Sequence, residues 1–234
     1  MKKIAFFVEG QTEQIFISEL LNQLFNEHKK VIKIHRMRKL YHNISIEDFI
    51  TDESKEYFVV IYDCGTDDKV KSDILDNYQK LQKSGCHYII GLQDFFNPKR
   101  KKEGITVRQL KKWLNFGLEQ IIPIEIFLAV QEIEAWIIAE EKHYETILPD
   151  FQLDNINTIA GIDIQTGNSE EIPHPALVLD KIYKAGGRTS GYPKNEYVVK
   201  DIVSKLDFTN LYLNVRSRNA SLNELLSCLD GLIP

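Results

Sequence analysis

The opening segment Lys3-Ile4-Ala5-Phe6-Phe7-Val8-Glu9-Gly10 determines the fold that the sequence predicts. Its short apolar run predicts a buried strand, and Glu9-Gly10 marks the point where such a strand passes into a helix. Apolar residues then recur every three or four positions, which predicts an amphipathic helix from Glu13 to about Asn26 with Thr12 as its N-cap. A strand followed at once by an amphipathic helix is the repeating unit of α/β folds.

The same alternation continues along the chain. Further strands are expected at Val31–His35, Tyr57–Tyr62, Tyr88–Leu92 and Ile124–Val130. Helices are expected at Lys69–Lys83, Thr106–Leu118, Glu132–Glu141, Ala176–Ala185, Glu196–Leu206 and Ser221–Leu229, with a loop over Pro149–Pro175. The pattern predicts an α/β domain over residues 1–145, with a mostly parallel sheet flanked by helices. A small helical C-terminal extension over residues 146–234 is expected to pack on it.

Composition limits the class of protein. Hydrophobic residues make up 43% of the 234 residues and charged residues 27%, which excludes a disordered or collagen-like chain. No apolar run approaches the roughly 20 residues that a bilayer span needs, and the apolar start is too short for a signal peptide. We therefore expect a cytoplasmic protein with no membrane partner. The three cysteines never form a CxxC pair, which argues against a disulfide framework and a structural zinc site.

Charge is unevenly distributed. The net charge of -5 argues against a protein that coats nucleic acid with its whole surface. Residues 29–39 nevertheless hold six Lys or Arg and no acid, and residues 99–112 hold seven with Glu103 as the one acid. Residues 132–150 hold six acids against Lys142. Each run can be a solvated helix face, but basic patches beside an acidic cluster are compatible with binding a polyanion around a metal site.

Acidic residues follow four of the five predicted strands: Glu9, Asp63, Asp94, and Glu132 with Glu134. In an open parallel sheet the carboxyl ends of the strands form the usual site. Carboxylates crowded there repel one another unless a cation intervenes, and Mg²⁺ prefers such oxygens and pairs with phosphate substrates. The residues alone therefore predict a metal site at this edge.

Each acid also has a structural interpretation. Glu13 can simply complement the N-terminus of its helix. Asp63 and Asp94 can be turn formers, because Asp suits the bend after a strand. Glu132 and Glu134 do not share a face of a continuous helix, so either they straddle a strand–helix junction or only one of them faces the site.

Several segments resemble a known family. Val8-Glu9-Gly10-Gln11-Thr12-Glu13, directly after a first strand, resembles the opening motif of TOPRIM-type proteins, the fold of topoisomerases, primases and OLD-family nucleases. The similarity is closest to small bacterial TOPRIM-like proteins encoded beside ABC/AAA ATPases in phage-defence loci. Further segments are similar in the same order: Ile61-Tyr62-Asp63, Gly91-Leu92-Gln93-Asp94-Phe95-Phe96, Gln131-Glu132-Ile133-Glu134-Ala135-Trp136, Pro175 with Leu179, and Gly191-Tyr192-Pro193-Lys194.

The resemblance implies roles for the first acids. Glu9 would be a metal ligand or general base, Glu13 a second ligand one helical turn on, and Asp63 or Asp94 the acidic position of the family. TOPRIM enzymes usually carry Asp-x-Asp at that position.

Here the sequence departs from the family, because Gly65 and Phe96 stand where the second acids of the two doublets would be. Strong binding of two metals then requires that Glu132 or Glu134 replace a lost acid, as a downstream acid does in OLD-like enzymes. Lys194 would match the late basic residue that stabilises charge on a phosphate.

The implied activity is metal-dependent hydrolysis of nucleic-acid phosphodiesters with one or two Mg²⁺ or Mn²⁺ ions, as the effector of an anti-phage or toxin-like system. The residues expected to hold the nucleic-acid backbone are Arg36, Arg38, Lys99, Arg100, Lys101 and Lys102. The alternative is a catalytically weak TOPRIM-like sensor or binding subunit, controlled by a partner ATPase. A homo-oligomer is compatible with either. Trp136 could stack on a base, but a Trp in Ala-Trp-Ile-Ile is more often a core residue.

Other chemistries fit less well. The six histidines show no HExxH spacing, so the sequence does not indicate a zinc hydrolase. Gly186 to Gly191 has the glycine spacing of a Walker A loop, but Tyr192-Pro193 stands where Lys-Ser/Thr is required. No Gly-x-Ser-x-Gly elbow occurs.

Overall fold

The structure is a computed structural model that describes residues 1–27, 32–38, 56–96 and 102–232; for residues 25–27, 32–38 and 67 it describes the backbone alone. The chain forms two compact units. The first unit comprises residues 1–93 and 104–128, and the second comprises residues 94–103 and 129–234. The segment 129–145, which the sequence prediction joined to the sheet, thus belongs to the second unit with the C-terminal helices, and the boundary at residue 145 stays a prediction.

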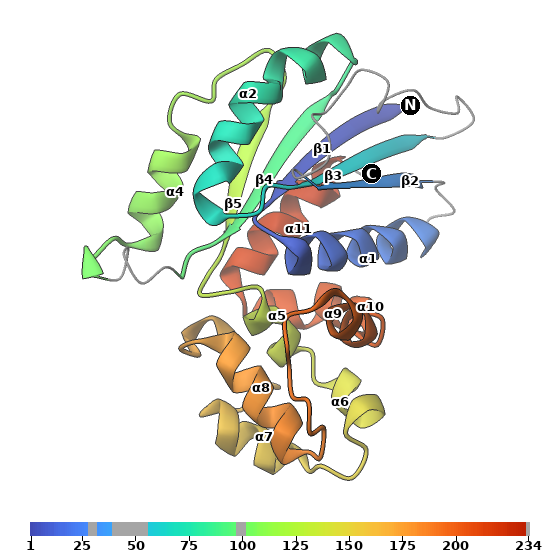
Figure 1. Ribbon diagram of the computed structural model, residues 1–234, viewed down its shortest axis with the longest axis vertical. Helices are drawn as coiled ribbons and strands as arrows, with labels where there is room; N and C mark the ends of the chain where they lie inside the picture. Colours follow the sequence, from blue (N-terminus) through green and yellow to red (C-terminus); the bar gives the residue numbers. More distant parts are fainter. Residues whose placement is uncertain (28–31, 39–55, 97–101, 233–234) are drawn as a thin grey trace. The chain divides into compact units, whose positions relative to one another are not determined.

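A five-stranded sheet forms the centre of the first unit (Figure 1). Its strands are β1 (Lys2–Val8), β2 (Ile32–Arg38), β3 (Tyr57–Asp63), β4 (Tyr88–Asp94) and β5 (Ile124–Ala129), in the order β2-β3-β1-β4-β5. β2 pairs parallel with β3, and β1 pairs parallel with both β3 and β4. The predicted parallel α/β fold is therefore confirmed.

The edge strand β5 also runs parallel to its neighbour. Ile89 of β4 donates its backbone N–H to Pro123 O, and Phe95 donates to Ala129 O. Both acceptors lie the same distance farther along the chain, which is the pattern of a parallel pair. The central strand β1 is at most 2% exposed from Ile4 to Val8, because helices cover both faces of a parallel sheet.

The helices of the first unit are α1 (Gln11–Glu27), the short 3₁₀ turn η2 (Asp67–Lys69), α2 (Val70–Lys83) and α4 (Val107–Asn115). The chain crosses the sheet in opposite directions through α1 and α2, so right-handed connections place these helices on opposite faces (Figure 1). Helix α1 begins earlier than predicted, which puts Thr12 inside its first turn and corrects the predicted N-cap.

Helix α4 ends three residues before the predicted Leu118. Its start is fixed by a capping box, in which the side chains and backbone of Thr106 and Gln109 bond reciprocally. At its end, the side-chain amide of Asn115 donates to Ile126 O and accepts from Ile126 N–H, at 2.9 and 2.8 Å. Phe116 is extended and Gly117 has φ +75°. The chain leaves the helix there to reach β5.

The second unit is helical. Its α-helices are α5 (Glu134–Ala139), α6 (Lys142–Ile147), α7 (Leu153–Ala160), α8 (Pro175–Ala185), α9 (Glu196–Val203), α10 (Phe208–Leu213) and α11 (Ala220–Leu232). Two 3₁₀ turns, η3 (Ser169–Glu171) and η4 (Val215–Ser217), lie between them. Within the described part of the chain, none of the helices combines the length and apolar character that crossing a membrane requires.

One sequence prediction for this unit was too long and another was wrong. The predicted helix Glu132–Glu141 is present as α5 but spans only Glu134–Ala139, and a separate helix, α6, begins at Lys142. The Glu140 carboxylate accepts the backbone N–H groups of Lys142 and His143 at the start of α6. The predicted loop over residues 149–175 contains α7 and η3. Helix α7 is held by Ile156 and Ala160, which are 1% and 7% exposed, inside a segment whose polar composition conceals them.

The core prediction for Trp136 is confirmed, since its side chain is 0% exposed. Its indole N–H donates to the Ser221 hydroxyl at 3.3 Å, and Glu170 accepts the backbone N–H of Ser221 at 2.8 Å. Trp136 thereby ties α5 to the start of α11 rather than presenting a ring to a nucleic acid.

Candidate metal site

Two of the predicted acids lie side by side at the carboxyl edge of the first unit's sheet. Glu9 directly follows β1 and Asp63 ends β3, and Val8 is paired with Asp63 in the parallel register. The backbone N–H of Glu9 donates to Leu92 O at 3.1 Å. Asp63 Oδ1 accepts the backbone N–H of Gly65 at 2.9 Å, and Gly65 has φ +82°. Asp63 is thus a turn former, as its structural interpretation expects.

Glu13 occupies the first turn of α1 and is 5% exposed. Its carboxylate lies over the preceding turn, because a Cβ placed on Gly10 would be 3.4 Å from Glu13 Oε2. The adjacent Gln14 donates its side-chain amide to Ile61 O at 3.1 Å and anchors α1 on β3. A negative charge in the first turn is stabilised by the helix dipole, so this position needs no metal to explain it.

The second unit contains a cluster of three acids: Asp94, Glu132 and Glu134. One carboxylate oxygen of each lies within 4.8 Å of the others. Asp94 closes β4, Glu132 follows β5, and Glu134 is the first residue of α5. The two glutamates therefore straddle the strand–helix junction, which is the first of the two predicted alternatives. Gln131, with φ +65°, makes the turn between them and the strand.

Each acid of the cluster is held by a different part of the unit. Asp94 Oδ1 accepts the backbone N–H of Ile133 at 3.1 Å. Glu132 Oε2 accepts the backbone N–H of Ala176, at the start of α8, at 3.0 Å. Glu134 Oε1 accepts the hydroxyl of Tyr192 at 3.1 Å. The carboxylates are oriented by fixed donors, which is what a preformed ligand set requires.

Lys194 is the positive charge of this site. Its Nζ lies 3.0 Å from Glu134 Oε1 and 3.5 Å from Glu132 Oε1. Burial alone would lower the pKa of Lys194, but the carboxylates of Glu134 and Glu132 raise it above its ordinary value. The ammonium therefore stays charged and partly neutralises the cluster, while its side chain remains 43% exposed.

The segment that carries Lys194 is fixed to α8. The backbone N–H of Tyr192 donates to Asp180 Oδ1 at 2.8 Å. The preceding Gly191 has φ +61°, and a Cβ there would lie 2.1 Å from the same Asp180 oxygen. Only glycine permits this approach. The Gly-Tyr-Pro-Lys segment is thus a rigid turn that presents a hydroxyl and an ammonium to the glutamates.

Glu134 is the least satisfied acid of the cluster. Its side chain is 0% exposed, and Oε2 has no hydrogen-bond partner among the described residues. Burial raises the pKa of Glu134 and repulsion from Glu132 adds to the rise, while Lys194 opposes it. A buried carboxylate oxygen without a donor costs about 1–3 kcal/mol. A bound cation would remove that cost.

The donor set fits a hard divalent cation. Three carboxylates offer oxygen ligands alone, which suits Mg²⁺, Mn²⁺ or Ca²⁺ and does not choose among them. Because Oε2 of Glu134 has no hydrogen-bond partner among the described residues, it is a buried carboxylate oxygen that could serve as a metal ligand.

The structure thus brings together four of the predicted site residues: Asp94, Glu132, Glu134 and Lys194. Glu9, Glu13 and Asp63 belong to the first unit, and their share in a metal site stays a prediction. The side chains of Arg36 and Arg38, and residues Lys99, Arg100 and Lys101, lie outside the described residues. Lys102 is exposed, and its contact with nucleic acid remains a prediction.

Sequence reasoning missed the groups that orient the cluster. The hydroxyl of Tyr192 and the backbone of Ala176 are direct partners of Glu134 and Glu132, and Asp180 positions Tyr192. Tyr192 lies two residues before Lys194 in a quoted segment, so its proximity could have been expected. The backbone N–H of Ala176, at the start of a helix, could not have been predicted as a partner of Glu132, because no sequence pattern indicates such a contact.

Fold and site together define an α/β protein with a helical second unit that carries a clustered set of carboxylates. The sequence matches the family DUF4276, described as a domain of unknown function, over residues 8–227. Since the match covers most of the chain, the protein belongs to that family. No curated protein and no solved structure matches the chain. The relation to TOPRIM-type proteins stays a prediction from the sequence segments.

Proposed function

We propose that this protein is a metal-dependent phosphodiesterase acting on nucleic acid, with Asp94, Glu132 and Glu134 as ligands of a divalent cation, Mg²⁺ or Mn²⁺. The observation that carries the proposal is the cluster itself, in which three carboxylates converge and one buried oxygen of Glu134 lacks a donor. Such an arrangement is costly in a purely structural role.

The residues of the site have distinct tasks. A divalent cation held there would lower the pKa of a water molecule and neutralise charge on a phosphate. Glu134 has to be ionised to serve as a ligand, because carboxyl groups bind metal ions in their deprotonated form. Lys194, which is partly exposed beside both glutamates, can hold a phosphate oxygen of the substrate. Tyr192 keeps Glu134 oriented through its hydroxyl.

The biological setting is proposed from the sequence resemblance alone. The protein would act in the cytoplasm as the effector of an anti-phage or toxin-like system, with an ABC/AAA-type ATPase as its partner. One or two metals and a homo-oligomeric state are both compatible with this setting.

A second candidate function is a catalytically weak sensor or binding subunit controlled by the partner ATPase. It is favoured by the ion pairs of Lys194, which neutralise part of the cluster without any metal. Gly65 and Phe96, which stand where TOPRIM-type enzymes carry the second acids of their doublets, point the same way.

The test is a thermal-shift titration with Mn²⁺ and Mg²⁺ on wild type and Glu134→Gln, with Glu119→Gln as a matched exposed control. Each melting temperature is compared with that of the same variant in EDTA. A cation that binds the folded state adds about 2.7 kcal/mol of stability at one hundred times Kd. We expect the shift in wild type and Glu119→Gln and its loss in Glu134→Gln. An equal shift in all three proteins would contradict the proposed site.

Cleavage is assayed next, on labelled DNA, RNA and tRNA with the same variants. We expect metal-dependent products with wild type that disappear with Glu134→Gln. Metal binding without cleavage of any of the three polymers would favour the sensor instead.

A further inference from the structure

The outward face of α4 in the first unit carries aromatic side chains that the core does not use. Leu110 and Leu114 are 4% and 2% exposed and form the buried face of this helix. Trp113 and Phe116, by contrast, are 64% and 74% exposed. Single exposed apolar residues are common, but two neighbouring aromatic rings at the surface call for a partner.

Positive charges surround these rings. Helix α4 has the sequence Val-Arg-Gln-Leu-Lys-Lys-Trp-Leu-Asn, which holds three basic residues and no acid. Arg108 and Lys112 are exposed, and neither makes a hydrogen bond or ion pair with another described residue. They are four residues apart, so they lie on one face of the helix, and Phe116 continues that line just beyond its end. The nearest acids along the chain are Glu103 and Glu119, which lie outside the two ends of α4.

A lysine from a neighbouring helix completes the surface. Lys71 of α2 donates from Nζ to Trp113 O at 2.9 Å and to Phe116 O at 2.8 Å. The same ammonium lies 5.3 Å from the centroid of the Trp113 ring. These bonds fix the backbone at the end of α4, from which both aromatic side chains project.

We propose that this aromatic–basic surface, formed by Arg108, Lys112, Trp113 and Phe116 with Lys71, binds single-stranded nucleic acid. Bases stack on the rings of Trp113 and Phe116, and Arg108 and Lys112 contact the phosphates. Stacking on aromatic side chains beside a cationic track is how proteins hold single strands of any sequence. A duplex keeps its base faces covered, so it cannot use the exposed rings. The inference rests on the proposed function, which it deepens by naming the class of substrate.

Charge separates this proposal from a protein-docking surface. The centres of protein interfaces are depleted in lysine, whereas here the Lys71 ammonium lies 5.3 Å from the Trp113 ring and the exposed Lys112 directly precedes Trp113 in the helix. A polyanion neutralises these charges on binding, and an ordinary protein surface does not. The chemistry of the surface therefore favours a nucleic acid, DNA or RNA, over a protein partner.

The experiment measures binding of the full-length protein to fluorescein-labelled oligothymidylate and oligouridylate in EDTA, where a metal-dependent nuclease cannot cleave them. We expect Trp113→Ala to raise Kd roughly ten-fold or more. Trp113→Phe, which keeps a ring, should restore most of the affinity. Tyr197→Ala removes another exposed ring, on α9, that is 80% exposed, and serves as the matched control that leaves Kd unchanged.

Two further readouts separate stacking from charge. Trp113 and Trp136 are the two tryptophans, and Trp136 is 0% exposed, so an oligonucleotide should quench the emission of wild type but not of Trp113→Phe. The double variant R108Q/K112Q should flatten the dependence of log K on log salt by about 0.7 for each lost phosphate contact. Lys181→Gln, at an exposed position of α8, is its control.

The outcomes are separable from those of the proposed function. If Trp113→Ala leaves Kd unchanged, the proposal that this surface binds single strands is overturned. The same holds if Trp113→Ala leaves the rate of single-strand cleavage unchanged. Failure to bind oligonucleotides together with self-association that Trp113→Ala abolishes also overturns it, in favour of protein docking. If binding depends on Trp113 but no cleavage occurs in Mn²⁺, the result supports the proposed binding surface and contradicts only the proposed nuclease activity.

Discussion

Glu134 and Glu140 stand at the two ends of α5, and both side chains are fully buried, yet their surroundings differ. Glu134 has the Tyr192 hydroxyl and Lys194 on one oxygen and no hydrogen-bond partner among the described residues on the other. Glu140 has donors on both: Oε1 accepts from Asn210 at 2.9 Å and from Lys142 N–H at 3.1 Å, and Oε2 from His143 N–H at 3.0 Å.

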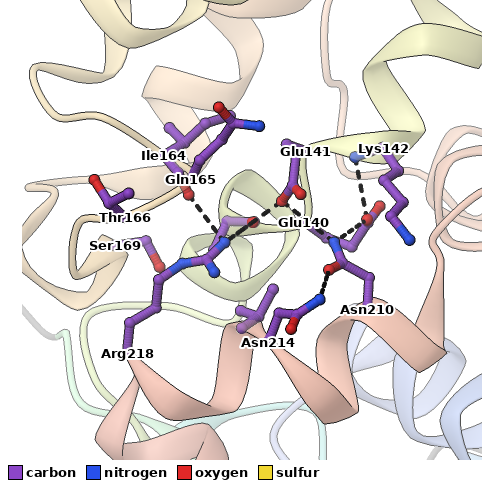
Figure 2. Close-up of polar contacts among 12 residues, drawn as sticks. Glu140, Glu141, Lys142, Ile164, Gln165, Thr166, Ser169, Asn210, Asn214 and Arg218 are labelled. Carbon is purple, nitrogen blue, oxygen red and sulfur yellow. Dashed lines mark hydrogen bonds and ion pairs between the residues drawn. The ribbon is translucent and has the colours of Figure 1, made fainter.

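The network around Glu140 continues into the C-terminal helices (Figure 2). Asn210 also donates to Glu141 at 3.2 Å and accepts from Asn214 at 2.8 Å. One guanidinium nitrogen of Arg218 donates to Ala139 O and Ile164 O, at 2.8 and 3.0 Å. These bonds join α5, α6, α10 and the segment after α7 into one polar core.

The pKa values of the two glutamates move in opposite directions. Burial raises the pKa of Glu134, and its few donors do not reverse the rise. Burial would also raise the pKa of Glu140, but hydrogen bonds from His143 and Asn210 outweigh it and hold the pKa below its ordinary value. Burial alone therefore does not identify a functional acid. The two buried acids differ in their hydrogen-bond donors: both oxygens of Glu140 have donors, whereas Oε2 of Glu134 has none among the described residues.

The largest expected effect comes from exchanging each acid for its isosteric amide. Glu140→Gln places an NH₂ group against backbone and side-chain donors and removes charge-assisted bonds, so we expect a loss of about 3 kcal/mol of unfolding free energy. Glu134→Gln removes a buried charge that has few donors, so the metal-free protein should change by less than about 1 kcal/mol. Urea unfolding in EDTA measures both. Equal losses in the two variants would erase the distinction between these glutamates.

The next effect concerns the cation that already faces the cluster. In Lys194→Met a positive charge beside the carboxylates is gone, so a divalent cation meets less repulsion and should bind about ten-fold more tightly, which is about 1.4 kcal/mol. Under the proposed function cleavage should nevertheless fall, because the variant lacks the ammonium that is proposed to hold a phosphate oxygen. Calorimetric titration with Mn²⁺ gives the affinity. The control is Lys142→Met, because Lys142 forms an exposed pair with Asp207 away from the cluster. Weaker Mn²⁺ binding in Lys194→Met would show that the lysine supports the site rather than competes for it.

The smallest effect is on the pH dependence of stability, for which metal-free unfolding is measured over a pH series. The stability that a raised pKa gives to Glu134 is fully present below the ordinary value of about 4.3 and is lost as pH rises through the raised value. The stability from Glu140 is present above the ordinary value and is lost as pH falls through the lowered one. Glu134→Gln should reduce the loss of stability with rising pH, and Glu140→Gln should reduce the loss of stability with falling pH. Each slope should change by less than about 1.4 kcal/mol per pH unit. If both variants changed the same part of the pH profile, the pKa values of the two glutamates would not be shifted in opposite directions.

The features that could be predicted from the sequence are those with a periodic or local signal. The apolar runs of β1, β3 and β4 are buried strands of a parallel sheet, as expected from Ile4–Val8 and its counterparts. Asp94, Glu132 and Glu134 were found because acids at strand ends converge in such a sheet. Lys194 was found through resemblance, since nothing in its local sequence indicates where the turn carries it.

The features that sequence reasoning missed depend on contacts between distant residues. Glu140 ends one helix and caps the next through its carboxylate, which no helical periodicity reveals. Helix α7 forms in a polar segment because Ile156 is buried by packing. The unpaired Oε2 of Glu134 reflects what its surroundings do not supply, and composition carries no sign of it.

The amide of Asn115 has a consequence for how this protein behaves in a crowded solution. The end strand of a sheet offers unpaired N–H and C=O groups that can recruit another chain and seed aggregation. Asn115 bonds to both polar groups of Ile126 and so imitates a neighbouring strand at the middle of β5. A foreign strand would have to displace that side chain before it could extend the sheet, and α4 would have to give way with it. Asn115 thereby hinders the addition of further strands at this edge of the sheet, which is how a fibril would grow.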